Sequence, residues 1–458
     1  MNPCCQYFSK ITILFLLLFF HVTSNIYAEE TLQNYKKKLL SGGDEQKIAI
    51  TSLKESGFHS LLEDVSKILH SKEIDTETLI RILELYDSYG DELISYLPNY
   101  VEDYEYILKH SQNDWIVVSI LKNIANKKDK RYVYTAIELM THRSSEVRQA
   151  VFKYLSSFKD DRILPYIFEL GNSEKPIERY YYLEALNYID DERMNIHVAK
   201  LLHDPSPAIR SEAIQVIKKF KMKDLENQVL NLAKFDSNYE VRKYAVQYAE
   251  SQNYKTRMDI FTKGILDSNP EVREVSISAI KNFRYPAYAP FVSKALEQEN
   301  LSSLRSEMIE SLLAMNSHGG GTGLIATLSQ EQDPIVRQRA AYAIGFLNAK
   351  MAVPSLNRSL LKDANLSVRI ESAKSLGKMR EKAGIPALLA KLKDFQENEA
   401  LRSQILISLE QIDDPKVMPF VFDIMEEDST SFRSQIKEFM RNMLYKYHNP
   451  RREYLVTM

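Results

Sequence analysis

The chain has 458 residues, of which 44% are hydrophobic and 27% charged, so it can bury a large core and is not an intrinsically disordered chain. Its formal net charge is −2, which argues against a general nucleic-acid-binding protein, because such proteins normally carry a strong basic excess. Only 13 glycines occur, and this scarcity favours helices over a turn-rich β protein.

The first 28 residues have the outline of a secretory signal peptide. A weakly positive start with Lys10 precedes the apolar run ITILFLLLFF and a polar stretch that ends at Ala28, where we expect cleavage. The run is shorter than the roughly 20 residues that cross a bilayer, and an uncleaved membrane anchor is the alternative. After cleavage we expect no transmembrane segment. The protein is predicted to be exported to the periplasm, with secretion or association with the cell envelope as alternatives.

Both cysteines, Cys4 and Cys5, precede the apolar run. The expected mature chain therefore has no disulfide, no thiol nucleophile and no thiolate metal site. Cleavage would remove Lys10 and no acidic residue, which leaves 60 − 1 = 59 basic against 62 acidic residues and a net charge of −3.

Residues 29–110 are expected to form degenerate N-terminal repeats or a cap. The segment KIAITSL fits the repeat described below, with Gln46 at the position that an arginine holds elsewhere, and Val117 takes this position in a later unit. Between them the sequence is rich in tyrosine, and these side chains either pack between helices or form a binding surface. The tyrosines are Tyr86, Tyr89, Tyr96, Tyr100, Tyr104 and Tyr106.

Residues 111–440 carry a regular series of arginines, 31 to 33 residues apart. Apolar residues recur one before and three, four and seven after the arginines, which places them on one face of a helix. Such a period predicts a stack of repeats. Six arginines follow a valine or isoleucine: Arg148, Arg210, Arg242, Arg273, Arg337 and Arg369. Arg179, Arg305, Arg402 and Arg433 complete the series.

Recurring prolines divide each unit into two helices. One proline stands three residues before the arginine, as at Pro270, and a second stands seventeen after it, as at Pro290. Proline favours the first position of a helix, because its missing N–H costs no hydrogen bond there. An aspartate often stands six residues before the arginine, where an acid suits a helix entry. Because a lone helix pair cannot bury its apolar face, the units must stack, which predicts an all-α solenoid of helix-turn-helix repeats. Residues 441–458 are expected to form a C-terminal cap or tail.

The stretch SHGGGTG at residues 317–323 interrupts this regular pattern. Its place in the repeat predicts a turn between the two helices of one unit that runs into the second helix. We expect a shortened second helix and a flexible joint there. The alternative is an anion site at the helix N-terminus, although the stretch holds no Lys or Arg.

The repeated core D-x-x-P-x-V-R-x-x-A-x-x-x-L resembles the HEAT-repeat superfamily, an armadillo-type fold, in a short form of about 31 residues that also occurs in phycobilin lyase subunits. The resemblance implies a right-handed α-solenoid whose second helices line a concave face and which binds other proteins. It also implies that the repeated Asp and Arg residues stabilise the stack. We therefore expect a structural role for Arg148, Arg210, Arg242, Arg273, Arg337 and Arg369, with the aspartates as partners, because a buried arginine needs one.

No pattern in the sequence points to a catalytic, cofactor or metal site. Iron-dependent hydroxylases of the HEAT type use His-Glu pairs, and none of the nine histidines here is followed by Glu. The motifs G-x-x-x-x-G-K-[ST], G-x-S-x-G and H-E-x-x-H are absent from the sequence. The sequence thus favours a non-enzymatic protein without a cofactor. A lyase-type enzyme or enzyme subunit and a structural protein of the envelope are the alternatives.

One column of the second helices predicts a partner-binding stripe. The position four residues after the second-helix start leans outward and is basic in the middle of the array. We expect this stripe to lie in the concave groove and to receive an acidic segment of a partner protein, whereas the alternative is ordinary solvated lysines. Its members are Lys200, Lys263, Lys294 and Arg358, with Lys391 next to one of the gaps.

Overall fold

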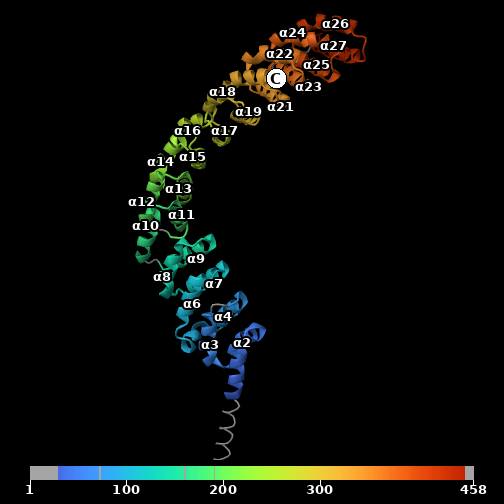
Figure 1. Ribbon diagram of the computed structural model, residues 1–458. Coiled ribbons are helices and arrows are strands. Elements are labelled where there is room, and N and C mark those ends of the chain that lie inside the picture. The colour runs from blue at the N-terminus through green and yellow to red at the C-terminus, as the bar shows by residue number, and fades with distance from the viewer. Residues whose placement is uncertain (1–28, 72–73, 159–160, 190, 449–458) are drawn as a thin grey trace, which may run out of the picture. The chain divides into compact units, whose positions relative to one another are not determined.

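The computed structural model describes residues 29–71, 74–158, 161–189 and 191–448, and these residues form helices and turns without a β-strand (Figure 1). The predicted signal peptide and the last ten residues of the predicted C-terminal tail lie outside the described residues. Residues 29–40 form a helix, and a bend at Ser41 follows it. The chain divides into two compact units, residues 1–197 and 198–458.

The N-terminal unit alternates two kinds of helix, which we call the first and second helices of each repeat. The first helices are α2 (Gly43–Ser56), α4 (Thr76–Tyr89), α7 (Asp114–Asn126), α9 (Ser145–Ser156) and α11 (Pro176–Ala185). The second helices are α3 (Leu62–Leu69), α5 (Leu93–Tyr96) with α6 (Tyr100–His110), α8 (Val133–Glu138), α10 (Leu164–Asn172) and α12 (Asn195–Leu201), within which the boundary of the unit falls. The 3-10 turns are η1 (His59–Leu61), η2 (Gly90–Glu92), η3 (Lys130–Tyr132), η4 (Leu139–Thr141), η5 (Asp161–Ile163) and η6 (Glu192–Met194).

The tyrosine-rich repeat of this unit uses several of its tyrosines as core residues. Tyr86, Tyr89 and Tyr104 are buried, whereas Tyr96 is 41% exposed. The Tyr86 hydroxyl donates to the buried carboxylate of Asp103 at 2.5 Å. Burial therefore accounts for three of the six tyrosines that the sequence left open between packing and binding.

The C-terminal unit continues the alternation with greater regularity. Its first helices are α13 (Pro207–Phe220), α15 (Tyr239–Ser251), α17 (Pro270–Phe283), α19 (Ser302–Met315), α21 (Pro334–Phe346), α23 (Leu366–Met379), α25 (Glu399–Ile412) and α27 (Arg433–His448). Its second helices are α14 (Glu226–Phe235), α16 (Met258–Gly264), α18 (Ala289–Gln298), α20 (Gly321–Gln330), α22 (Val353–Lys362), α24 (Ile385–Leu392) and α26 (Met418–Glu427). The 3-10 turns are η7 (Lys223–Leu225), η8 (Pro286–Tyr288), η9 (His318–Gly320), η10 (Lys350–Ala352), η11 (Lys382–Gly384) and η12 (Pro415–Val417).

The recurring prolines stand at the helix starts. Pro207, Pro270 and Pro334 are the first residues of their helices. The second proline, as at Pro290, is the second residue of its α-helix, because a 3-10 turn precedes that helix. A residue with positive φ, such as Arg284, ends the first helix before this turn, which is a common way to terminate a helix.

Within the C-terminal unit the first and second helices form two layers (Figure 1). The apolar residue before each arginine is buried between them, as at Val241, Val272 and Val368. The first helices lie on the inner side of the bend that this unit makes, and the second helices lie on its outer side. The expectation that second helices line the concave side does not hold in this unit.

The glycine-rich stretch does not shorten the second helix, so that expectation was wrong. The helix α20 has ten residues, as do α18 and α22. Its glycines instead permit close packing: a Cβ on Gly323 would lie 2.4 Å from the carbonyl oxygen of Ser293 on α18. The backbone N–H of Gly323 also donates to the Ser293 hydroxyl at 2.9 Å. Tight contact between neighbouring second helices explains the stretch without a ligand.

Candidate functional site

A ladder of arginine–carboxylate pairs links successive repeats of the C-terminal unit. In each pair, or rung, the arginine of one repeat binds a carboxylate near the start of the next repeat. These side chains are largely buried, so the ladder is part of the core rather than a solvated surface network. The rungs are Arg210–Asp236, Arg242–Asp267, Arg273–Glu299, Arg305–Glu331, Arg337–Asp363, Arg369–Glu397 and Arg402–Asp428.

Each rung joins three parts of the stack. The Nε and Nη2 atoms of Arg242 each lie 2.7 Å from one carboxylate oxygen of Asp267. The Nη1 atom donates to the carbonyl oxygens of Asp236 and Ser237, which follow the preceding second helix. The Asp267 carboxylate also accepts the backbone N–H of Asn269. The guanidinium therefore satisfies carbonyls that the end of a helix leaves free, and the carboxylate satisfies a helix-entry loop.

Hydrogen bonding outweighs burial in setting the pKa of rung carboxylates such as Asp267 and Glu397. Burial by itself raises the pKa of Asp267, but the hydrogen bonds from Arg242 and from the backbone N–H of Asn269 bring it below its ordinary value. At Glu397, burial is opposed by Lys391, the Asn398 N–H and Arg369, and the pKa falls to about 2. Asp267 and Glu397 are therefore ionised at neutral pH.

The aspartates of the sequence pattern serve as rung partners of the preceding repeat. Asp267, for example, lies 25 residues after its partner Arg242. Sequence reasoning singled out only the aspartates, although Glu299 and Glu331 hold the same position six residues before an arginine. A search for either Asp or Glu six residues before each repeat arginine would have found both glutamates.

Arg148, in the N-terminal unit, departs from this scheme. Its Nε atom lies 2.8 Å from the carboxylate of Glu184, which belongs to the helix α11 rather than to a loop. Its Nη1 atom still donates to the carbonyl oxygens of His142 and Arg143. The helix-capping half of the rung is thus kept, and the carboxylate comes from another element.

The cations expected to bind a partner lie on the second helices. Lys200, Lys263, Lys294 and Arg358 are exposed, and none of them forms an ion pair with another residue among those described; we call them the stripe. Lys263 lies 4.1 Å from the ring centroid of Phe235, which is 70% exposed. The stripe therefore combines free positive charge with at least one exposed aromatic ring.

Lys391 differs from the other predicted members of the stripe. Its ammonium lies 2.7 Å from Glu397, a rung carboxylate, and 3.4 Å from Asp394. Its side chain is 16% exposed. The structure thus places Lys391 beside the ladder and not among the free cations.

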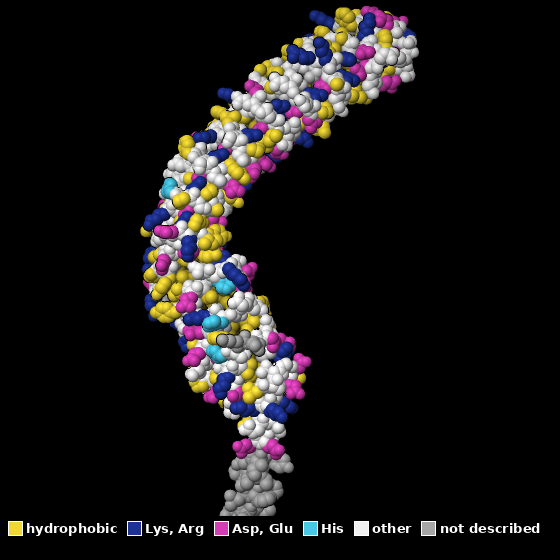
Figure 2. All heavy atoms as spheres, in the orientation of Figure 1, with side chains coloured by type: hydrophobic (Ala, Val, Ile, Leu, Met, Phe, Trp, Pro, Cys, Tyr) yellow, Lys and Arg dark blue, Asp and Glu magenta, His cyan; other side chains and the backbone are white. Residues whose placement is uncertain are grey.

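The surface of the C-terminal unit carries both signs of charge. Figure 2 shows basic and acidic side chains interspersed over the visible face, without a large patch of one sign.

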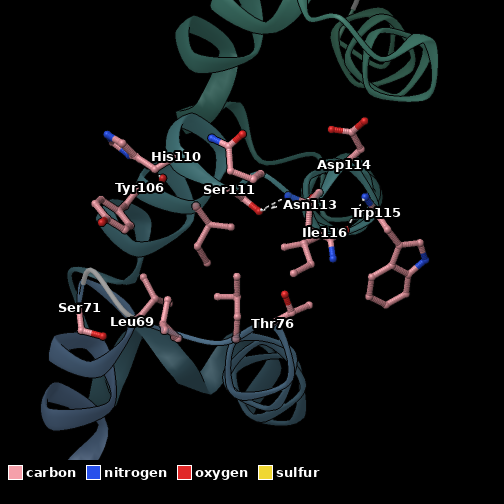
Figure 3. A pocket seen from close by; sticks show the side chains of 14 residues that line it. Leu69, Ser71, Thr76, Tyr106, His110, Ser111, Asn113, Asp114, Trp115 and Ile116 are labelled. Carbon is pink, nitrogen blue, oxygen red and sulfur yellow. Dashed lines mark hydrogen bonds between the residues drawn. The ribbon is translucent and has the colours of Figure 1, made fainter.

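A cleft of about 650 Å³ lies in the N-terminal unit between α3 and α4 on one side and α6 and α7 on the other (Figure 3). Its walls include the apolar side chains of Leu79, Ile107 and Ile116. Trp115, which is 62% exposed, lies at its edge, and the carboxylate of Asp114 points away from that indole. Sequence reasoning did not foresee this cleft.

The described residues hold no group of three or more His, Cys, Asp or Glu side chains placed to bind a metal ion. No helix among these residues is both long and apolar enough to span a bilayer.

One family model and several solved structures resemble parts of this chain. A family model described as HEAT repeats matches residues 321–396 and 359–439. No curated protein matches the chain. Among solved structures, one of Kap95p with RanGDP is 13% identical to this chain. The match covers 94% of this chain and 68% of the Kap95p chain, with a TM-score of 0.42. Kap121p bound to Pho4p is 11% identical, and the match covers 93% of this chain and 56% of the Kap121p chain, with a TM-score of 0.44. Escherichia coli YibA is 17% identical, and the match covers 64% of this chain and 96% of the YibA chain, with a TM-score of 0.31.

The protein is an all-α solenoid built from stacked helix pairs. Residues 321–439 match HEAT repeats, and the same arginine period continues in the repeats before them. The narrower resemblance to the repeats of phycobilin lyase subunits stays a prediction.

Proposed function

We propose that the protein is an exported, non-enzymatic scaffold that binds other proteins, and that its stripe receives an acidic segment of a partner. One observation carries the proposal: the four stripe cations hold the same repeat position, are exposed, and form no ion pair with another residue that the structure describes. Some other lysines of the same unit are paired, such as Lys234 with Asp259 at 2.9 Å and Lys281 with Glu307 at 2.8 Å, whereas Lys218, Lys223 and Lys255 form no ion pair with a described residue. Cations without internal partners can engage a partner's carboxylates without first breaking an ion pair.

The arrangement suits an extended or helical acidic segment. The stripe residues occupy α12, α16, α18 and α22, so a partner would run along the stack and cross several repeats. The exposed ring of Phe235 beside Lys263 adds an apolar contact of the kind that anchors protein interfaces. Because the ladder fixes neighbouring repeats, the helices that carry the cations keep their spacing, and only the side chains have to be ordered on binding.

The test is charge reversal at three members of the stripe: Lys263→Glu, Lys294→Glu and Arg358→Glu together. Binding of a fluorescein-labelled polyglutamate peptide, measured by anisotropy, should weaken by at least about tenfold and lose its salt dependence. The matched control reverses Lys218, Lys223 and Lys255, which are exposed lysines outside the stripe. Equal weakening in the control, or unchanged capture of partners from an envelope extract by the stripe variant, would refute the stripe.

Export rests on the N-terminal sequence and has its own test. Expression of the full chain in a two-membrane bacterium, followed by fractionation and mass determination, should find a periplasmic chain that begins at residue 29. If the uncleaved chain is found in the cytoplasm, export is refuted, and the proposal of a protein-binding scaffold is unaffected.

A further inference from the structure

The cleft between α4 and α7 lies in the N-terminal unit, at the repeat position that a rung fills in the C-terminal unit. In a regular repeat the rung arginine stands four residues after the N-cap of the first helix, as Arg242 follows Asn238. The N-cap of α4 is Asp75, so Leu79 holds the arginine position there. Leu79 cannot cap carbonyls or bind a carboxylate.

The acid position of the same rung is also changed. In regular repeats the acid stands two residues before the N-cap and accepts the N-cap N–H, as Asp236 does for Asn238. The N-cap of α7 is Asn113, and Ser111 accepts its N–H at 3.2 Å. A serine thus occupies the carboxylate position, with the backbone geometry of a regular repeat preserved.

Cavities at equivalent positions vary with the side chain in the arginine position. Where Arg273 and Glu299 form a rung, the space measures about 200 Å³. Between α2 and α4, where Gln46 stands, it measures about 300 Å³, and Gln46 caps the carbonyl of Leu39 at 2.9 Å. Where Leu79 stands, it reaches about 650 Å³. The two first helices beside this cleft, α4 and α7, hardly touch each other, whereas α2 and α4 pack together.

The chemistry left in the cleft is that of two incomplete neighbouring rungs, because no guanidinium is present at position 79 or at position 117. The carbonyls of Ser111 and Gln112, which an arginine at position 117 would cap, accept no hydrogen bond from the described residues, because Val117 stands there. The C-terminus of α6 adds the negative end of a helix dipole. No Lys or Arg among the described residues lines the cleft, and Trp115 offers an indole face at its edge.

We propose that this cleft binds an arginine side chain of a partner protein, which takes the place of the missing rung. Its guanidinium reaches the Ser111 hydroxyl and the free carbonyls, and stacks on Trp115. Its aliphatic stem lies against Leu79 and Ile116. The site lies in the N-terminal unit and does not include the stripe residues. The two proposals, an arginine in this cleft and an acidic segment on the stripe, can therefore be tested independently.

Trp115 is the only tryptophan of the chain, so its fluorescence reports directly on the cleft. We would titrate the purified chain with the peptide acetyl-Leu-Arg-Leu-amide and with the same peptide carrying citrulline, a neutral isostere of arginine. The arginine peptide should change the emission saturably, and the citrulline peptide should bind about tenfold more weakly. Equal affinity for both would show an apolar docking cleft and overturn the proposal, as would no response to either.

Rebuilding the rung provides the second arm. The double substitution Leu79→Arg with Ser111→Asp should fill the cleft from within and abolish the fluorescence response, with the melting temperature unchanged or raised. Should this variant fail to fold, Trp115→Ala removes an exposed side chain instead, and calorimetry should find at least about fivefold weaker binding of the arginine peptide. The matched control is Ile335→Ala, which holds the same repeat position in α21 and is 61% exposed. Unaltered binding in the folded double variant or in Trp115→Ala would overturn the proposal.

Discussion

At the scale of single residues, the rung Arg402–Asp428 is the most deeply buried of the ladder. The two side chains are 1% and 0% exposed, and their nearest atoms lie 2.5 Å apart. The guanidinium also lies 4.2 Å from the ring centroid of Phe432. Loss of the cation would leave a buried carboxylate without its partner, which is costlier than the net value of the pair itself.

We therefore expect Arg402→Met to destabilise the C-terminal unit by about 3–5 kcal/mol in urea unfolding followed by circular dichroism. The double variant Arg402→Met with Asp428→Leu should recover most of this loss, because it leaves no buried charge. If the single variant is as stable as the parent chain, or if the double variant is no better than the single one, the rung does not act as described.

The residue-scale pattern was predictable from sequence only in part. The arginine positions follow from their period, and buried arginines require partners. The partner of Arg148, Glu184, could not be predicted, because it lies on a helix and breaks the column. The cleft was missed because it depends on what is absent, an arginine at position 79 and an acid at position 111, in repeats too degenerate to align with confidence in their register.

At the scale of elements, helix pairs follow from the apolar period, but the fit between neighbouring helices does not. The 3-10 turns before the second helices leave no mark in the period. The glycines of residues 319–323 suggested flexibility, whereas Gly323 packs closely against α18. A run of glycines shows that side chains are absent from the backbone. Whether this absence permits motion or close packing depends on the helix that lies beside it.

Two glycines of this stretch give a matched pair. A Cβ at position 323 would meet the Ser293 carbonyl oxygen at 2.4 Å and Leu296 Cβ at 3.0 Å, so Gly323→Ala must push α20 from α18. We expect a loss of about 1–3 kcal/mol, measured by thermal unfolding. At position 319 the nearest atom, of Pro290, would lie 3.4 Å away, an ordinary contact. Gly319→Ala should therefore change stability by less than about 0.5 kcal/mol. Similar effects for both would contradict the packing explanation.

At the scale of the whole molecule, the ladder couples the stability of the C-terminal unit to pH. The pKa values of Asp267, Glu299, Glu331, Asp363, Glu397 and Asp428 all lie below their ordinary values in the folded chain. Burial opposes this shift in each case, and the hydrogen bonds of the rungs outweigh it. Because the unfolded chain then binds more protons than the folded chain in mild acid, stability falls as the pH falls.

The pH window is sharpest at Glu397. Its contribution is fully present above its ordinary value of 4.5 and is lost as the pH falls toward about 2. Glu397→Gln removes this carboxylate from between Arg369 and Lys391 while keeping its size. The free energy of unfolding of this variant should lie below that of the parent chain at pH 7, and the difference should narrow steadily between pH 4.5 and the lowest pH at which the chain stays folded. Urea unfolding at a series of pH values measures this difference directly. A difference that stays constant with pH would mean that Glu397 stabilises the stack by packing alone, and that the ladder is not the source of its sensitivity to acid.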